Sequence, residues 1–198
     1  LPEKKVSEDD YLEGELHSDI KHEYIDGDVY AVSGAKANHN RIVSNINRKF
    51  GNHLDGAPCE PFSSDMKVKI GRQYFYPDVL VDCSSIKGSD VFTESLTLIV
   101  EVLSKSTRKM DETTKRFAYM QIPTLQEYVI VEQDIVDIEV VRKSDGWQPK
   151  HYYLGDEVTF ESIELTLTVE EIYDRVDNED KAEWLLKKNM NKKDVVKQ

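Results

Sequence analysis

The run from Leu96 to Leu103 constrains the fold of this chain more than any other stretch. Its residues, LTLIVEVL, are apolar or β-branched apart from one carboxylate, Glu101. A run of this length and composition is typical of a strand that is buried on both faces of a sheet. A buried carboxylate is costly unless it is protonated, paired with a cation or bound to a metal ion. The surroundings of Glu101 are therefore the first question that the sequence raises.

Composition limits the class of protein. A chain of 198 residues, of which 39% are hydrophobic, suits one domain with a sizeable core. The formal net charge is -12, and this argues against a generic polyanion-binding protein, because neutralising phosphates requires clustered Lys and Arg. The balance still allows a local basic face for nucleic acid.

The two cysteines, Cys59 and Cys83, lack both a CxxC spacing and a neighbouring His in the sequence. Two thiols in a chain of this size more often indicate a reducing compartment, although the sequence does not exclude a disulfide. No window approaches the roughly 18 apolar residues of a membrane span, and the first residues lack the apolar core of a signal peptide. We expect a soluble, cytoplasmic protein with no membrane partner.

Helix and strand patterns alternate along the rest of the chain. The predicted order is a helix capped by Ser7, a hairpin turning at Asp26-Gly27, an amphipathic helix over 37–50, strands over 66–70, 74–82 and 96–103, a helix ending before Pro123, strands over 127–132, 135–142, 147–153 and 164–167, and a short helix from Thr168. This order predicts an α/β or α+β fold with a mixed β-sheet flanked by helices. We expect one domain over 1–175 and an acidic, then basic, helical tail over 176–198.

Details of these elements are also predicted. Asn38 is a plausible cap for the amphipathic helix. Pro77 implies an edge or a bulge in its strand, and 86–94 is typical of a loop. In the helix before Pro123, the inward face is marked at a spacing of three and four residues by Met110, Thr114, Phe117 and Met120.

A geometric argument links Asp78 to Glu101. If the strands that carry them pair, side chains of matching parity lie a few ångström apart on one face. Carboxylates that close repel each other, and a Mg²⁺ ion between them removes the repulsion. The alternative is that Asp78 ends a turn after Pro77 and that Glu101 pairs with an interior Lys or Arg. For Glu101 the apolar neighbours favour the functional interpretation.

Five ordered motifs resemble a known superfamily. They are HEYIDGDVY from His22, NHNRI from Asn38, YPDV from Tyr76, IVEVLS from Ile99 followed by the segment from Asp111 through Lys115 to Tyr119, and EYVIV from Glu127. Together they resemble the PD-(D/E)XK nuclease superfamily, and within it the bacterial Uma-type, DUF820-like family of restriction-endonuclease-like proteins. The resemblance covers about residues 20–175, and it implies a restriction-endonuclease-like fold.

The resemblance also implies roles for individual residues. Asp78 and Glu101 would bind Mg²⁺, for which Mn²⁺ would substitute, with the backbone carbonyl of Val102 as a further ligand. Glu23 matches the early glutamate of the family, which in such nucleases can hold a metal-bound water.

The chain departs from the superfamily at Leu103. The superfamily lysine normally lies two residues after the glutamate, because a strand period of two places both on one face. The Uma-type branch tolerates the change by moving the lysine to the following helix. The resemblance makes Lys115 the first candidate and Lys105 the second.

Basic residues suggest a rim that faces phosphates. His39 sits in a family-like motif at a helix start, where it could face the site and bind DNA, and a capping or packing role is an equal alternative. Asp65 is better explained as a strand-end acid than as a third carboxylate. The candidate rim consists of Arg41, Arg48, Lys49, Lys105, Arg108, Lys109 and Arg116, and a solvated charged face would explain these residues nearly as well.

The expectation that follows from the resemblance is a Mg²⁺-dependent endonuclease that hydrolyses DNA through activated water. A competing hypothesis is a nuclease-fold protein that binds DNA or a protein partner without cleaving, which Leu103 and the acidic charge favour. A homodimer is expected because enzymes of the restriction type often cut both strands as dimers.

Overall fold

The apolar run forms the central strand of the largest sheet. In the computed structural model, which describes residues 5–32, 34–104, 108 and 110–195, this strand is β8 (Leu96–Leu103). It pairs antiparallel with β6 and parallel with β9, so that both of its edges are covered. Every residue of β8 except Thr97 is buried. The prediction of a strand buried on both faces is confirmed.

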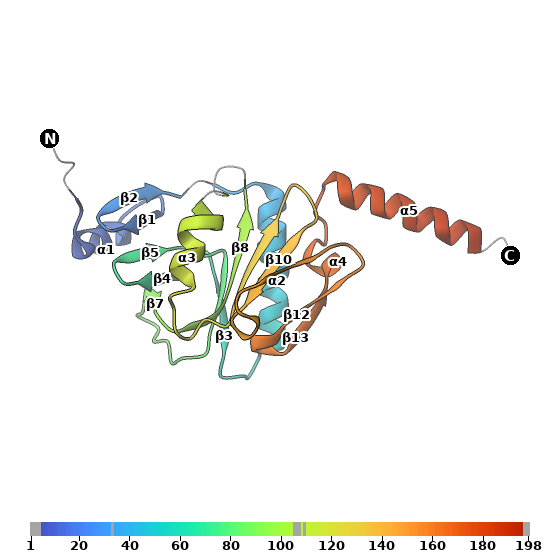
Figure 1. Cartoon of the computed structure of the whole chain (residues 1–198). Helices are drawn as coiled ribbons and strands as arrows, with labels where there is room; N and C mark the ends of the chain where they lie inside the picture. Colours follow the sequence, from blue (N-terminus) through green and yellow to red (C-terminus); the bar gives the residue numbers. More distant parts are fainter. Residues whose placement is uncertain (1–4, 33, 105–107, 109, 196–198) are drawn as a thin grey trace.

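The central sheet is mixed and has six strands (Figure 1). In spatial order they are β11 (Pro149–Tyr152), β10 (Ile138–Arg142), β9 (Glu127–Glu132), β8, β6 (Val79–Asp82) and β3 (Glu60–Ser63). Successive side chains of β8 face opposite sides, so Leu98, Val100 and Val102 pack into one core while Ile99 and Leu103 pack into another. Glu101 therefore shares a face with Leu103.

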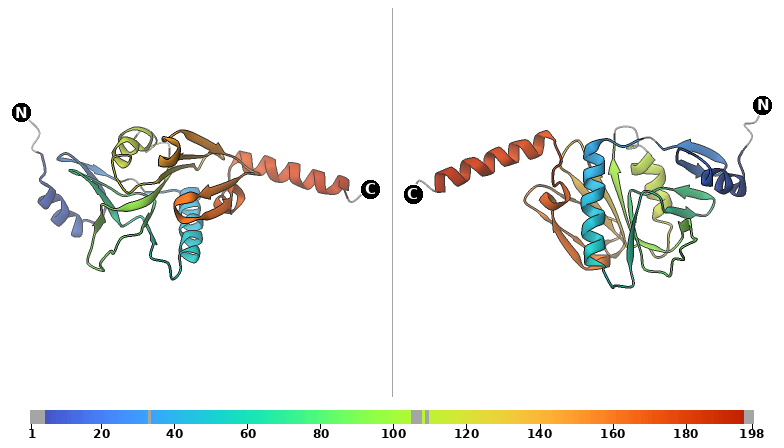
Figure 2. Two further views of the ribbon diagram at one scale, coloured as in Figure 1. Left: turned by 60° about the horizontal axis from the view of Figure 1, so that its bottom comes forward. Right: turned by 180° about the vertical axis from the view of Figure 1, so that it is seen from behind.

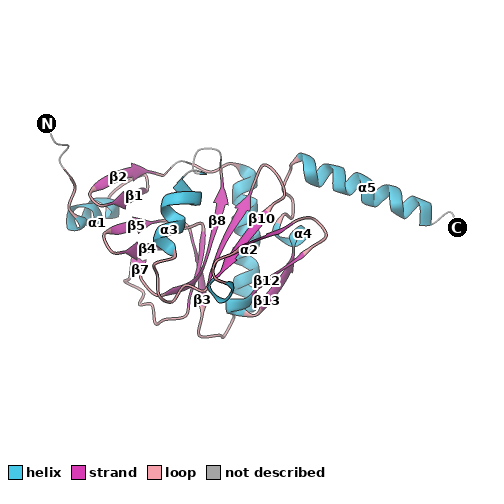
Figure 3. Ribbon diagram, viewed as in Figure 1, coloured by secondary structure: helices cyan, strands magenta, loops and turns pink. Residues whose placement is uncertain are grey.

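Helices lie on both faces of this sheet (Figures 2 and 3). The long helix α2 (Ala37–His53) covers the face of Val100, and it buries Ile42, Val43, Ile46 and Phe50. The opposite face is covered by a π-helical turn, η1 (Met110–Lys115), and by the short helix α3 (Arg116–Tyr119). The α+β fold with helices flanking a mixed sheet is as predicted.

Smaller units complete the fold. A five-stranded sheet has the order β2 (Asp28–Ala31), β1 (His22–Ile25), β5 (Gln73–Phe75), β4 (Lys67–Ile70) and β7 (Phe92–Thr93). Its buried Tyr24 and Tyr74 pack with Tyr11 of α1 (Glu8–Leu16). A third sheet pairs β12 (Glu157–Phe160) with β13 (Leu165–Thr168). The remaining helices are α4 (Val169–Ile172), α5 (Glu179–Val195) and the 3-10 turns η2 (Lys143–Asp145) and η3 (Glu161–Ile163).

Several local predictions are confirmed by backbone and capping geometry. Ser7 caps α1 by accepting the amide of Asp10. The hairpin between β1 and β2 turns at Asp26 and Gly27, whose φ angles of 48° and 98° fit a two-residue turn with left-handed residues. Thr168 caps α4 through a reciprocal capping box with Glu171.

Other local predictions are wrong. The strand predicted over 74–82 is broken by Tyr76-Pro77-Asp78, and the loop predicted over 86–94 contains β7. Asn38 does not cap α2, because its side chain bonds the backbone of Asp177 instead. Phe117 is 69% exposed rather than inward-facing, because a π-helical turn has a wider period that shifts the buried face of the following residues. The short strands β3 and β12 were not predicted.

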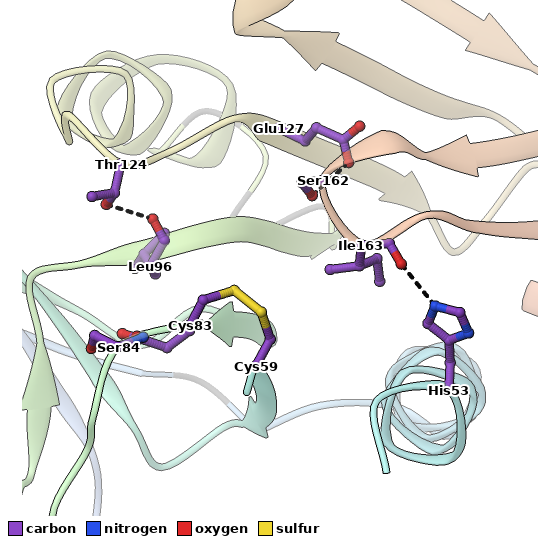
Figure 4. The surroundings of a disulfide bond; sticks show 10 residues. His53, Cys59, Cys83, Ser84, Leu96, Thr124, Glu127, Ser162 and Ile163 are labelled. Carbon is purple, nitrogen blue, oxygen red and sulfur yellow. Dashed lines mark hydrogen bonds between the residues drawn. A yellow bond between two sulfur atoms is a disulfide. The ribbon is translucent and has the colours of Figure 1, made fainter. Parts of the chain in front are cut away.

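The two cysteines are joined rather than free. Cys59 and Cys83 form a disulfide between the chain before β3 and the chain after β6 (Figure 4). They occupy facing positions because Glu60 pairs with Asp82 in the antiparallel ladder of β3 and β6. The interpretation of two reduced thiols is therefore wrong, and the cytoplasmic location that it supported stays a prediction.

The C-terminal helix α5 extends away from the body of the molecule (Figure 1). Its described residues include the exposed side chains of Leu185, Leu186 and Met190. Within the described residues, none of the helices combines the length and the apolar character that crossing a membrane requires. The boundary predicted at residue 176 stays a prediction.

Candidate active site

Asp78 and Glu101 occupy facing positions on adjacent strands. Val79 pairs with Val100 and Leu80 with Ile99, so continuing the register by one residue places Asp78 opposite Glu101. Alternation along the strands puts Glu101 on the face covered by α3, while the side chain of Asp78, which precedes β6, contacts the backbone of Val102 and His39 of α2. The prediction that their two strands pair is confirmed. Asp78 is further fixed because its Oδ2 accepts the backbone N–H of Val102 at 2.8 Å.

Pro77 leaves the carbonyl of Val102 without a ladder partner from this side. The same register places Pro77 opposite Val102, and proline has no backbone N–H to donate. The N–H of Val102 bonds the Asp78 carboxylate instead of a neighbouring strand. The Pro-Asp dipeptide thus ends the ladder between β6 and β8 and places a carboxylate beside the backbone of Val102.

Glu101 is held by two donors from the covering helix. Its side chain is 3% exposed, and its Oε1 accepts the hydroxyl of Tyr119 at 2.7 Å and lies 3.4 Å from Nζ of Lys115. Burial, reinforced by the negative charge of Glu101, raises the pKa of Tyr119 well above its ordinary value. The hydroxyl therefore stays protonated and donates a hydrogen bond to the carboxylate.

Lys115 reaches this face of the sheet from the covering turn η1 and not from β8. Leu103, at the usual lysine position, is 1% exposed and packs with Ala118 and Tyr119. The last residue of η1 is Lys115, whose Nζ lies 2.7 Å from Oε1 of Glu23 as well as near Glu101. The covering helix thus supplies the cation that the strand lacks.

Glu23 joins the two sheets at the site. It lies in β1 with a 7% exposed residue surface, next to the fully buried Tyr24. Its Oε1 accepts the backbone N–H of Tyr76 at 3.2 Å and also contacts Lys115. Glu23 therefore fixes the segment before Pro77 and orients the lysine in the same cluster.

His39 contacts Asp78 from the other side. The buried stripe of α2 at Ile42, Val43 and Ile46 extends back by one turn to His39, which is why its ring points inward. Its Nε2 lies 3.1 Å from both oxygens of Asp78. Its Nδ1 is buried without a hydrogen-bond partner in the described part of the chain.

These side chains border a cavity of about 610 Å³ at the end of the central sheet. His39, Asp78, Glu101, Val102 and Lys115 all line it, together with backbone and side chains from the β2–α2 connection and from Ser104 and Gln133. The cavity thus gives solutes access to Asp78 and to an otherwise buried lysine and glutamate.

The donor set suits a hard divalent cation. Mg²⁺ binds through one or two carboxylates and keeps several waters, and Asp78, Glu101 and the carbonyl of Val102 provide oxygen ligands of this kind. Among the described residues, no three His, Cys, Asp or Glu side chains already converge on one point. Glu101 is turned toward Lys115 and Tyr119, so a bound ion would complete its shell with the carbonyl and with water.

The cations predicted for the rim have different surroundings. Arg108 forms a bidentate pair with Glu132, Arg116 bonds Glu139 at 2.6 Å, and Lys49 bonds Glu171. Lys105 and Lys109 lie outside the described residues. Asp65 bonds Lys21 and is exposed, in agreement with its interpretation as a strand-end acid.

A second, shallower groove of about 580 Å³ lies along the outer side of α2 and meets the first cavity at Asn40. Arg41, Arg48 and Arg175 line it, together with Asp174. Burial, with the positive charge of Arg41 as a further cause, lowers the pKa of Lys181, while Asp174 opposes that effect. Three arginines and one aspartate thus line this groove, and Arg175 lies 3.9 Å from that aspartate.

Sequence reasoning missed Tyr119 as a site residue, and it allowed His39 to face the site without predicting its contact with Asp78. The signal for Tyr119 was its position four residues after Lys115, which places the two on one helix face. The signal for His39 was the apolar stripe of α2, which continues through position 39.

Comparisons with known proteins identify the family of this chain. The family model Uma2, described as "Putative restriction endonuclease", matches residues 8–170. The uncharacterized protein slr1290 of Synechocystis sp. is 38% identical over 177 residues, covering 87% of this chain and 93% of that protein. The uncharacterized protein sll1609 of the same organism is 37% identical over 139 residues, covering 68% of this chain and 78% of that protein.

A solved structure shares the fold. It is the crystal structure described as "a putative nuclease belonging to DUF820" from Anabaena variabilis, with a TM-score of 0.71 and 15% sequence identity. The match covers 85% of this chain and 97% of that chain. The predicted nuclease-like fold is confirmed.

Proposed function

Because this chain belongs to the Uma2 family of restriction-endonuclease-like proteins, we propose that it is a metal-dependent endonuclease that hydrolyses DNA phosphodiester bonds. The observation that carries the proposal is the position of Lys115. Its Nζ lies 3.4 Å from Oε1 of Glu101 and lines the cavity that also contains Asp78. A lysine and two carboxylates around one cavity are the groups that phosphodiester hydrolysis requires.

Each residue has a distinct role in the proposed reaction. Asp78 and Glu101 hold Mg²⁺, or Mn²⁺ in its place, together with the carbonyl of Val102. Such an ion, when bound, supplies activation of the attacking water and charge neutralisation at the phosphate. Lys115 stabilises the negative charge that develops on the phosphate oxygens.

Two further residues orient these groups. Glu23 contacts Nζ of Lys115 at 2.7 Å and thereby directs the ammonium toward the cavity. Tyr119 donates to Oε1 of Glu101 and restricts the rotation of that carboxylate. Preorganised groups of this kind act without rearrangement during the reaction.

The arginine groove supports DNA as the partner. Arg41, Arg48 and Arg175 line a surface that continues from the cavity through Asn40. Phosphate contacts of such residues position a duplex without reading its sequence. Arg108 and Arg116 bond carboxylates of the chain, and Arg175 lies 3.9 Å from Asp174, so these three contribute less to a positive surface than Arg41 and Arg48 do.

The experiment is a cleavage assay on supercoiled plasmid and on single-stranded DNA in Mg²⁺ or Mn²⁺. We expect nicking by the wild-type chain and a loss of at least about 100-fold in rate for Glu101→Gln and for Lys115→Met. Glu157→Gln removes an exposed carboxylate from β12 and is the matched control, with an unchanged rate.

Two results would contradict the proposal. Full activity of Glu101→Gln would show that the reaction, or a contaminating nuclease, does not use this site. A wild-type chain that binds DNA but leaves it intact in both metals would instead establish the competing function, a binding protein without cleavage.

A further inference from the structure

His39 is built into the metal-binding side of the site. It lies in the first turn of a helix of 17 residues whose buried stripe fixes the direction of the ring. Its side chain is 14% exposed and lines the same cavity as Asp78 and Val102. A residue that served only to contact DNA phosphates would be expected on the outer side of α2, where Arg41 and Arg48 lie.

The spacing between His39 and Asp78 fits two ligands of one ion. Nε2 of His39 lies 3.1 Å from each oxygen of the Asp78 carboxylate. Adjacent ligands of an octahedral ion at about 2.1 Å are separated by about 3.0 Å. The observed distance therefore needs little adjustment for an ion to be shared by the imidazole and the carboxylate.

The ring can offer a lone pair at Nε2. Its Nδ1 is buried and has no hydrogen-bond partner in the described part of the chain, so the contacts of the ring are those of Nε2 with the Asp78 carboxylate, which in the absence of a metal accepts from an Nε2–H. With the proton on Nδ1, the neutral ring exposes the Nε2 lone pair toward Asp78.

We propose that His39 is a metal ligand through Nε2 and that it makes the site selective for Mn²⁺ over Mg²⁺. The inference rests on the proposed metal site of Asp78 and Glu101. Imidazole suits transition-metal ions, whereas carboxylate, carbonyl and water ligands suit Mg²⁺ and Mn²⁺ alike. A mixed set of His39, Asp78, Glu101 and the carbonyl of Val102 therefore favours the ion that accepts both kinds of donor.

The alternative role for His39 is to orient Asp78 by donating a hydrogen bond. His39→Gln separates the two roles, because its amide N–H can still donate to Asp78 but gives no nitrogen lone pair to a metal. His151→Gln is the control, since His151 lies in β11 and contacts Asp137. Both variants are compared by metal binding, so the comparison does not depend on cleavage activity.

The test uses the metal-free full chain with Mn²⁺ or Mg²⁺ alone. Calorimetry gives the affinities, and pulsed EPR of the Mn²⁺ complex detects nitrogen bound to the ion, assigned by ¹⁵N-labelled histidine. We expect nitrogen coupling in the wild type and its loss in His39→Gln. That variant should bind Mn²⁺ at least about tenfold more weakly, while its Mg²⁺ affinity changes by less than about threefold.

Wild-type Mn²⁺ complexes without nitrogen coupling would overturn the inference, and this measurement needs no variant to fold. Equal losses of Mn²⁺ and Mg²⁺ affinity in His39→Gln would also overturn it. Asp78→Asn distinguishes the two levels of the argument. If it abolishes metal binding while His39→Gln does not weaken Mn²⁺ binding, only the role of His39 fails. If Asp78→Asn retains both affinities, the proposed metal site fails as well.

Discussion

Two buried clusters on the central sheet pair a glutamate with a cation, and they differ in access. In the closed cluster, Glu127 of β9 bonds Arg142 of β10 at 3.1 Å, and their side chains are 1% and 5% exposed. In the open cluster, Glu101 of β8 contacts Lys115, and their side chains are 3% and 7% exposed. The exposed fractions are thus alike. Glu101 and Lys115 line the cavity, whereas neither residue of the closed cluster does.

The partners of the two glutamates also differ. Glu127 accepts the backbone N–H of Glu161 at 2.6 Å and the hydroxyl of Ser162 at 3.1 Å, besides its bond with Arg142. Burial raises the pKa of Glu127, and these donors oppose the rise. Arg142 also lies 3.4 Å from Glu161, whose side chain is 56% exposed, whereas Glu101 shares Lys115 with Glu23, whose side chain is itself buried. The closed cluster therefore has one buried carboxylate, and the open cluster brings two buried carboxylates together.

This difference separates a structural ion pair from a candidate active site. Burial alone does not distinguish the two clusters, and neither does the presence of a cation. A cavity and converging carboxylates do, because repulsion between carboxylates is relieved by a metal ion that arrives from solvent.

Removal of each carboxylate is the strongest way to test this comparison. Glu127→Gln leaves Arg142 buried without its closest acid, and we expect it to lower the free energy of unfolding by about 3 kcal/mol. Glu101→Gln keeps an oxygen that accepts the Tyr119 hydroxyl, and Lys115 keeps Glu23, so we expect a loss below about 1 kcal/mol. Urea unfolding at pH 7 measures both.

The two substitutions should have the opposite order of effect on metal binding, with Glu101→Gln the more damaging. Mn²⁺ should raise the melting temperature of Glu127→Gln as it does for the wild type, and it should not do so for Glu101→Gln. Equal destabilisation by the two substitutions would remove the distinction between the clusters.

The disulfide tests whether stability and metal binding depend on opposite ends of β6. Cys83 follows the end of this strand and Asp78 precedes its start, so the disulfide lies at the end of the strand opposite the site. Figure 4 shows the disulfide together with Glu127 and Ser162 of the closed cluster. We expect the double variant Cys59→Ser, Cys83→Ser to lose about 3 kcal/mol, because the bond closes a loop of 24 residues.

Urea unfolding without reductant measures this loss, and metal affinity should not change. Alkylation followed by mass spectrometry of the native chain is the control, with no thiol labelled before reduction. Two labelled thiols, or a lower metal affinity in the double variant, would contradict the expectation.

The central strands and the carboxylates were predictable because their signals are local. The apolar run of β8 and the β-branched run of β9 each specify a buried strand without help from distant residues. Glu101 stood out because it is the one charge in its run. The pairing of its strand with the strand that follows Asp78 was the premise of the parity argument, and the register of β6 and β8 confirms that premise.

The lysine geometry was less predictable. The position of Lys115 came from resemblance to a family, since spacing along the strand pointed to Leu103. The π-helical turn before α3 shifts the buried face, so a period of three and four residues wrongly placed Phe117 inside. Which residues of such a turn face inward depends on the sheet below, which a local pattern does not contain.

Short strands were missed for a related reason. The two-residue strand β7 pairs with β4, and β3 pairs with β6. Segments this short have little propensity of their own and are specified by neighbours that are distant in sequence. The homodimer stays a prediction, because it depends on surfaces between copies of the chain.

Tyr119 offers a milder test of the open cluster. Tyr119→Phe removes the donor to Glu101 but keeps the ring that packs against Phe75 and Tyr128. We expect a loss of about 1 kcal/mol in stability and a weaker affinity for Mn²⁺, because Glu101 is then free to rotate. Tyr128→Phe is the control within the same aromatic group. Unchanged metal affinity in Tyr119→Phe would show that Lys115 alone orients the carboxylate.

The smallest effect on stability is expected at an exposed ion pair outside the cavity. Lys49 bonds Glu171, whose side chain is 39% exposed and also caps α4. The hydrogen bond from Lys49, and then that from the backbone of Thr168, lower the pKa of Glu171. The charged form is therefore favoured in the folded state. Its contribution is present above the ordinary glutamate pKa and is lost as the pH falls below it.

Glu171→Gln should accordingly lower stability at pH 7 by less than about 1 kcal/mol, and the difference from wild type should shrink toward zero near pH 3. Melting temperatures across this pH range measure it, with Glu157→Gln as an exposed control outside any ion pair that we describe. A difference that persists at low pH would mean that the capping geometry, which a glutamine partly retains, contributes more than the charge. The contribution of Glu171 to stability would then come mainly from its capping geometry and not from its ion pair with Lys49.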